Sequence, residues 1–137
     1  MTSRVRLSPE LRERLIEHAL SSPGEEVCGL LGGNVSGLNS VYPVRNIANK
    51  PQSRFLMSPE EQIAAIRVMR KRGETLAGIY HSHPDTEAVP SNADIELAAY
   101  PDVYYFIISL AKPRPELKCY ILEGNVFNEV PISETSD

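Results

Sequence analysis

Hydrophobic residues recur at helical spacing in two long segments of the chain. Residues 9–20 carry apolar side chains three to four positions apart, and Ser8-Pro9 supplies a helix start. Residues 59–72 repeat this pattern after the capping box at 58–61, and Gly73 supplies a helix end. Both segments are predicted to be amphipathic helices that cover a core.

Shorter apolar runs between and after these helices predict strands. The predicted strands are 27–33, 38–44, 75–83, 103–110, 117–123 and 126–130. The first two are expected to form a hairpin across 34–37, and the last two a hairpin at Gly124-Asn125. A third, short helix begins near Ser91 and ends before Pro101.

The predicted order α-β-β-α-β-α-β-β-β indicates an α/β fold with a mixed central β-sheet flanked by helices. A chain of 137 residues fits one domain with one core. We expect a single domain over residues 1–132 and a polar C-terminal tail over residues 133–137.

Charge and composition exclude several classes of partner. The chain has 14 Lys plus Arg against 18 Asp plus Glu, a net charge of −4, so no general field attracts nucleic acid. The basic cluster 67–72 falls at a predicted helix end, where cations complement the helix dipole. No apolar run approaches the ~18 residues of a membrane span. We therefore expect no nucleic-acid partner, no membrane partner and a cytoplasmic location.

Two cysteines and one histidine are expected to be structural residues without a role in chemistry. Cys28 and Cys119 stand apart in separate apolar runs without a CxxC grouping, and this is typical of buried core residues. His18 lies on the first amphipathic helix and is expected to be a surface residue.

The other two histidines suggest a metal site. His81 and His83 are two positions apart on a predicted strand, so their side chains leave the same face, with Cα atoms about 6.5 to 7 Å apart. A catalytic zinc site uses three protein ligands and one water. Asp94, in the first turn of the short helix, is a candidate third ligand if the loop before it returns to the strand end. Ser91 to Asp94 also fits an ordinary helix-capping box, so both interpretations stay open.

Taken together, these residues resemble a known signature. His81-Ser82-His83-Pro84, then six residues, then Ser91, two residues and Asp94 resemble the motif of JAMM (MPN-plus) zinc metalloproteases of the small prokaryotic type. Residues 25–33 resemble the family segment that carries a catalytic glutamate in the pattern E-x-C-G, which selects Glu26 over Glu25. The resemblance extends from the first helix to the last hairpin and includes FLMSPEE before the second helix.

The resemblance implies a JAMM/MPN fold with a cytidine-deaminase-like layout and a Zn²⁺ ion held by His81, His83 and Asp94. It implies that Glu26 exchanges protons during amide hydrolysis, and that Ser91 stabilises an oxyanion, a role compatible with helix capping. It also implies a zinc metalloprotease, a peptidase or isopeptidase whose partner is a ubiquitin-like or sulfur-carrier protein with a Gly-Gly tail.

Three other functions are alternatives to this interpretation. A non-catalytic zinc-binding MPN interaction module would share the ligands. A DNA-repair-associated relative of the same fold is disfavoured by the acidic charge balance and by the lack of an attached helical nucleic-acid-binding module in this sequence. A zinc nucleobase deaminase is disfavoured because no PCxxC follows an HxE.

Overall fold

The computed structural model describes residues 4–98 and 100–133, and its elements follow the predicted order. The helices are α1 (Pro9–Ser21), α2 (Pro59–Lys71) and α3 (Asn92–Leu97). The strands are β1 (Val5–Arg6), β2 (Cys28–Asn34), β3 (Gly37–Val44), β4 (Thr75–His83), β5 (Tyr104–Ser109), β6 (Glu116–Glu123), β7 (Val126–Val130) and β8 (Ile132–Ser133). The prediction of a mixed sheet flanked by helices is confirmed.

The main sheet has six strands in the order β3-β2-β4-β5-β6-β7. β4 and β5 pair in parallel, whereas the other neighbours are antiparallel. The short strands β1 and β8 pair in parallel near the two ends of the chain, and no pattern in the sequence predicts them. Two residues are too few to show an alternating pattern. Of the predicted tail, Ser133 belongs to β8 and residues 134–137 lie outside the described residues.

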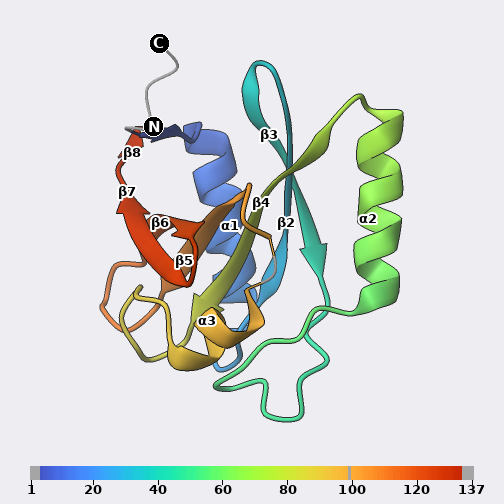
Figure 1. Ribbon diagram of the computed structural model, residues 1–137. Helices are drawn as coiled ribbons and strands as arrows, with labels where there is room; N and C mark the ends of the chain where they lie inside the picture. The colour runs from blue at the N-terminus through green and yellow to red at the C-terminus, as the bar shows by residue number, and fades with distance from the viewer. Residues whose placement is uncertain (1–3, 99, 134–137) are drawn as a thin grey trace.

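Helices α1 and α2 lie on opposite faces of this sheet (Figure 1). Leu11 and Leu15 of α1 pack in one buried cluster with Tyr80 of β4. Met69 of α2 packs in the other cluster with Ile79 of β4. Because side chains alternate along a strand, His81 and His83 lie on one face, as predicted, and this is the α2 face that Ile79 shares.

The helix ends match the sequence signals. Ser8 and Ser58 are the N-caps of α1 and α2, and their hydroxyls accept hydrogen bonds from the amides of Leu11 and Glu61 at 3.2 and 3.3 Å. Gly73 follows α2 with φ of 71°, a conformation that favours glycine. None of the helices within 4–98 and 100–133 is long and apolar enough to cross a membrane.

Two predictions about isolated residues had different outcomes. Cys28 and Cys119 are free and buried, as expected. His18 is half-buried rather than on the surface, and its Nδ1 lies 2.7 Å from the Tyr80 hydroxyl. The physical reason is helical geometry, because His18 lies next to the buried Ala19 at the border of the apolar stripe.

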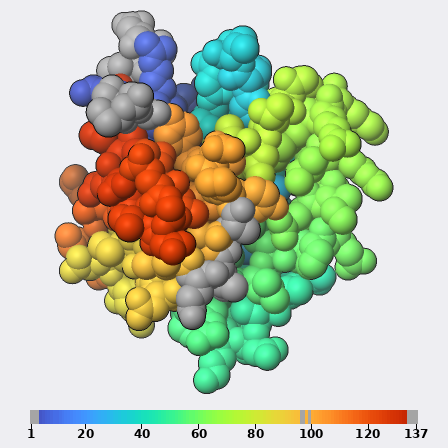
Figure 2. Space-filling model, viewed as in Figure 1, coloured from blue at the N-terminus to red at the C-terminus, as the bar shows by residue number. Residues whose placement is uncertain are grey.

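Three segments meet where β4 ends. Pro84 follows the last residue of β4, and α3 lies beside this end of the strand (Figure 1). The connection 45–58 between β3 and α2 passes the same end, where the Glu26 N–H donates to the Pro51 carbonyl at 2.7 Å. In the space-filling view, the segment containing α2 and the segment containing β7 form the two sides of the visible face (Figure 2).

Candidate metal centre

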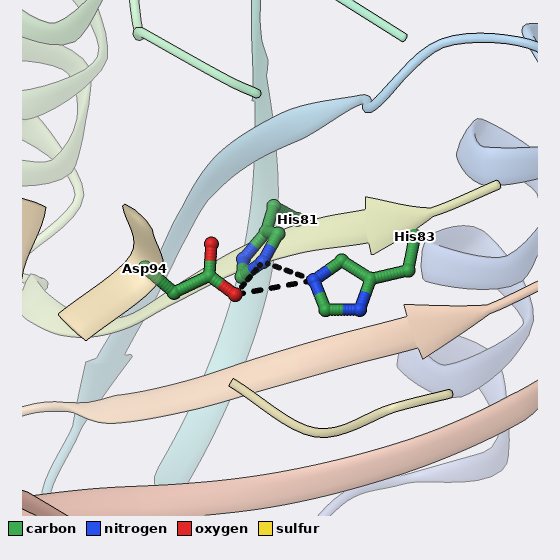
Figure 3. Close-up of side chains that lie close together, drawn as sticks. All are labelled: His81, His83 and Asp94. Carbon is green, nitrogen blue, oxygen red and sulfur yellow. Dashed lines mark hydrogen bonds and ion pairs between the residues drawn. The ribbon is translucent and has the colours of Figure 1, made fainter. Parts of the chain in front are cut away.

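Three predicted site residues converge at the C-terminal end of β4. His81 and His83 come from β4 and Asp94 comes from the first turn of α3 (Figure 3). The Asp94 Oδ2 atom lies 3.1 Å from the Nε2 atom of each histidine, and the two Nε2 atoms are 3.1 Å apart. All three residues are at least 92% buried, with exposed fractions of 4%, 2% and 8%. The two nitrogens and one oxygen therefore form a nearly equilateral triangle that is buried from solvent.

A backbone carbonyl sets the tautomer of His83. The His83 Nδ1 lies 2.7 Å from the Glu87 carbonyl oxygen, which can only accept a hydrogen bond. Nδ1 must therefore carry a proton. In the neutral ring the Nε2 lone pair points at His81 and Asp94, and in the protonated ring the Nε2–H donates to Asp94. This arrangement, in which the outer ring nitrogen donates to a carbonyl, is typical of metal-binding histidines.

The electrostatics of the group favour an anionic Asp94. Burial opposes ionisation of this carboxyl, but hydrogen bonds from His81 and His83 outweigh burial and lower its pKa. Burial also lowers the pKa of His81, despite its hydrogen bond to Asp94. The pKa of His83 is raised, because its bonds to Asp94 and to the Glu87 carbonyl outweigh burial. A cation at the centre would have to displace the proton that the raised pKa of His83 favours on that ring.

The donor set fits zinc. Two imidazole nitrogens and one carboxylate oxygen are ligands that catalytic zinc sites use, and bonds of ~2.0 to 2.2 Å in a tetrahedron separate donor atoms by about 3.3 to 3.6 Å. The donor separations in the triangle, 3.1 Å, are close to that range. The ring of Phe55 stacks on His81 at 4.4 Å between centroids and gives the group an apolar wall.

Glu26 lies next to this group, just before β2. It is 6% exposed, and its Oε1 has no hydrogen-bond partner within the described part of the chain. Burial raises its pKa to about 7, while His83 and Asp94 act on it with opposite signs. Glu25, the alternative register, is exposed. The structure thus places a buried carboxyl at position 26 that can gain or lose a proton near neutral pH.

Ser91 is the N-cap of α3. Its hydroxyl accepts a hydrogen bond from the Asp94 N–H at 3.1 Å, and its own N–H donates to Asp94 Oδ2 at 2.8 Å. This capping box, one of the two interpretations from the sequence, holds the Asp94 carboxylate toward the histidines. The bond uses an oxygen lone pair, so the hydroxyl hydrogen is left for another acceptor.

A pocket that sequence reasoning missed adjoins the ligands. It has a volume of about 280 Å³, and its wall includes His81 and Asp94. The rest of the lining is mainly apolar and comes from the connection before α2, from β4 and β5, from the α3 region and from β7: Phe55, Leu56, Met57, Ile79, Pro90, Ala98, Tyr100, Tyr105, Ile107 and Phe127, with Gln62 as a polar member. These residues share no local spacing, so the sequence held no signal for the pocket.

Comparison with known proteins gives a consistent result. The profile of the family described as prokaryotic homologs of the JAB domain matches residues 8–120. The desampylase of Haloferax volcanii is 30% identical to this chain over an alignment that covers 96% of the chain and 97% of that protein. The CysO-cysteine peptidase of Mycobacterium tuberculosis is 33% identical over 90% of the chain and 86% of that protein.

A solved structure has the same fold over nearly the whole chain. The solution structure of protein DSY2949 from Desulfitobacterium hafniense superposes with a TM-score of 0.84 at 37% identity, and the match covers 94% of this chain and 91% of that one. The likeness therefore includes the sheet, both large helices and the segments that carry the triangle.

Proposed function

Because the chain belongs to the family of prokaryotic homologs of the JAB domain, we propose that it is a zinc-dependent peptidase that hydrolyses an amide bond at the C-terminal tail of a ubiquitin-like sulfur-carrier protein. The family membership confirms the JAMM resemblance, and the relatives' names include a desampylase and a peptidase. The observation that carries the proposal is the buried triangle of His81, His83 and Asp94 together with a buried Glu26 whose Oε1 has no hydrogen-bond partner in the described residues.

In this proposal His81, His83 and Asp94 hold the zinc ion. Bound there, zinc supplies a Lewis acid that polarises a carbonyl and lowers the pKa of water. The protein's own contribution is to fix the ligands before binding, since Glu87 orients His83 and Ser91 orients Asp94. Residues 1–132 make up the single catalytic domain in this assignment.

Glu26 moves the protons of the reaction. An attacking water must lose a proton and the departing amine must gain one, and one carboxyl can take the first and deliver the second. The pKa of Glu26, raised by burial to about 7, suits a group that does both near neutral pH. Because its Oε1 atom has no hydrogen-bond partner in the described residues, that oxygen is available to accept the proton.

Ser91 stabilises negative charge on the substrate oxygen. Its hydroxyl hydrogen is free to donate, because the capping bond to the Asp94 N–H uses an oxygen lone pair. A donor aimed at the carbonyl oxygen favours the tetrahedral state, in which that oxygen becomes an anion.

The surroundings of the triangle support an extended substrate. The two histidines and Asp94 are at least 92% buried, with exposed fractions of 4%, 2% and 8%, so a folded segment is too wide to reach them. A thin tail with Gly-Gly at the cleavage point can approach closely, because glycine has no side chain to collide with the walls. The apolar pocket beside His81 gives room for another part of the substrate.

We place this reaction in the cytoplasm.

The proposal is tested with a ubiquitin-like carrier fused to a C-terminal peptide through Gly-Gly. Mass spectrometry of the zinc-loaded protein with this fusion is expected to show release of the C-terminal group, and a matched Val-Val fusion is expected to stay intact. Removal of zinc by a chelator should stop the reaction, and added zinc should restore it. Equal cleavage of both fusions, or no cleavage of either with zinc bound, would contradict the tail-processing function.

The non-catalytic module is disfavoured by Glu26. A zinc site that serves stability alone has no use for a carboxyl oxygen that is buried without a partner, because such a group costs free energy of folding. The carboxyl is explained when the site performs proton transfer. The fusion experiment separates the two functions, because a module binds zinc and releases nothing.

A further inference from the structure

The position of the Glu26 side chain must be set through its backbone. Its carboxyl oxygen Oε1 has no hydrogen-bond partner in the described residues, so no hydrogen bond within them anchors that oxygen directly. The peptide group between Glu26 and Val27 is instead held by two hydrogen bonds. The Asn46 side-chain amide donates to the Glu26 carbonyl at 2.8 Å, and the Val27 N–H donates to the Ser82 hydroxyl at 2.8 Å.

Ser82 replaces a regular bond of the sheet. Cys28 and His81 are the last paired residues of β2 and β4, so Val27 and Ser82 face each other one step beyond the ladder. The Ser82 N–H still donates to the Val27 carbonyl at 3.0 Å, but the Val27 N–H bonds to the Ser82 hydroxyl. In a regular antiparallel pair both bonds join backbone groups. The side-chain hydroxyl, which is fully buried, therefore fixes where the chain leaves the sheet toward Glu26.

Asn46 uses its whole hydrogen-bonding capacity at this place. Its amide nitrogen donates to the Glu26 carbonyl and to the Arg54 carbonyl at 2.8 and 2.9 Å. Its oxygen accepts from the amides of Ala48 and Leu56, each at 3.0 Å. A side chain with two donors and two acceptor sites can make four such bonds. Asn46 thus ties Glu26 to the connection 45–58, which carries Phe55 and Leu56 of the pocket wall.

We propose that Asn46 and Ser82 are positioning residues that clamp the backbone around Glu26 and so hold its carboxyl in place for proton transfer. Neither side chain belongs to the triangle of proposed zinc ligands. Ser82 lies between the two candidate ligands on β4, so the clamp gives Glu26 a fixed relation to the strand that carries them. Asn46 gives it a fixed relation to the wall of the pocket. The expected effect on proton transfer rests on the proposed function, whereas the restraint on the backbone around Glu26 does not.

The clamp has a physical reason. Burial without a hydrogen bond to Oε1 leaves the Glu26 carboxyl poorly solvated, and relaxation toward water would lower its free energy. Proton transfer requires a heavy-atom distance of ~2.6 to 3.2 Å, and a displacement of about 1 Å costs on the order of 10²-fold in rate. Hydrogen bonds to both polar atoms of the peptide group between Glu26 and Val27 limit such displacement.

The first experiment measures backbone protection in the zinc-loaded protein by amide hydrogen exchange. Ser82→Ala is expected to speed exchange at the Val27 amide about tenfold, because it loses its acceptor. Ser109→Ala is the matched control: Ser109 is also a buried serine at a strand end, and its hydroxyl bonds Thr86 and Ala111 instead. The control should leave the Val27 amide unchanged. Unchanged Val27 exchange in Ser82→Ala would overturn the clamp, whether or not the protein cleaves any substrate.

The second experiment measures kcat and KM separately with the Gly-Gly fusion. Ser82→Ala and Asn46→Asp are each expected to lower kcat on the order of 10²-fold with KM within about twofold and zinc content unchanged, because the base is displaced and the ligands are not. Asn46→Asp keeps the oxygen that accepts from the Ala48 and Leu56 amides, so the hydrogen bonds within the connection 45–58 are retained. It removes the N–H donors to the Glu26 and Arg54 carbonyls. Asn34→Ala, which removes a bond to the Ser36 amide in the β2–β3 turn, is the control.

The outcomes separate the clamp from the proposed function. If the wild type cleaves and both variants keep the kcat of Asn34→Ala, the clamp is wrong and the proposed function stands. If the wild type cleaves nothing, the proposed function fails, and the exchange at Val27 still decides whether the clamp exists.

Discussion

Ser91 and Asp94 fix each other across the first turn of α3, and the oxygen they share belongs to the candidate metal centre. The Ser91 N–H donates to Asp94 Oδ2 at 2.8 Å, and the same Oδ2 lies 3.1 Å from the Nε2 of both His81 and His83. A helix cap and a ligand are thus parts of one arrangement. The capping box and the metal motif, which were alternatives in the sequence, are compatible in the structure.

Loss of Asp94 should therefore remove the metal. Asp94→Ala, like His81→Ala and His83→Ala, is expected to reduce zinc from about one per chain to near zero, because a catalytic site has three protein ligands and none to spare. Elemental analysis of protein dialysed against zinc-free buffer measures this. Full zinc retention by Asp94→Ala would show that Asp94 only caps the helix.

Loss of the Ser91 hydroxyl should act on turnover. Ser91→Ala is expected to lower kcat by about 10²- to 10³-fold, the effect of removing one oxyanion donor, with zinc still bound. Ser8→Ala is the matched control, because Ser8 caps α1 through an equivalent bond to Leu11. The control should lose about 1 kcal/mol of stability and keep its kcat. Equal kcat in the two variants would reduce Ser91 to a helix cap.

The raised pKa of Glu26 predicts a pH-dependent effect on the stability of the zinc-free protein. Burial raises this pKa from 4.5 to about 7, so the folded protein binds a proton that the unfolded chain releases above pH 4.5. This contribution is complete below pH 4.5 and is lost as pH rises through 7. Glu26→Gln should therefore unfold like the wild type near pH 4.5 and be more stable by about 2 to 3 kcal/mol at pH 8.

Urea denaturation in the presence of a chelator measures this difference across the pH range. Glu25→Gln, which alters an exposed neighbour, should follow the wild type throughout. A free-energy difference between Glu26→Gln and wild type that does not change with pH would mean that the Glu26 carboxyl is not desolvated.

The pocket predicts an effect on substrate binding. Phe127 is half-buried and lines the pocket from β7, whereas its neighbour Val126 is 58% exposed and does not. Phe127→Ala is expected to raise KM about tenfold with a smaller effect on kcat, because it removes apolar contact without touching the ligands or Glu26. Val126→Ala should leave both constants within about twofold. A comparable KM for the two variants would place the substrate elsewhere.

Local signals in the sequence were sufficient for most elements. The bounds of β4 and β7 were predicted to the residue, because Pro84 ends one and the Gly124-Asn125 turn begins the other. The starts of α1 and α2 followed from their serine caps and N-terminal prolines. The pair of β1 and β8 was missed, because its two-residue strands are specified by a contact between the chain ends rather than by local pattern.

The candidate site was partly visible in the sequence. Spacing on a strand places His81 and His83 on one face, but the approach of Asp94 depends on how the connection 84–91 returns, which spacing alone leaves open. The stacking of Phe55 on His81 and the bonds of Asn46 and Ser82 to the chain around Glu26 join distant segments. Such contacts depend on the three-dimensional fold and have no fixed sequence spacing.

The most direct test of the account compares Glu26→Gln with Glu25→Gln in the same Gly-Gly fusion assay, with zinc content measured on the same samples. The account predicts about one zinc per chain in both variants, release of the C-terminal group by Glu25→Gln at the wild-type rate, and a loss of several orders of magnitude in Glu26→Gln. Turnover by Glu26→Gln near the wild-type rate, with zinc bound, would contradict the assignment of Glu26 as the group that moves the proton.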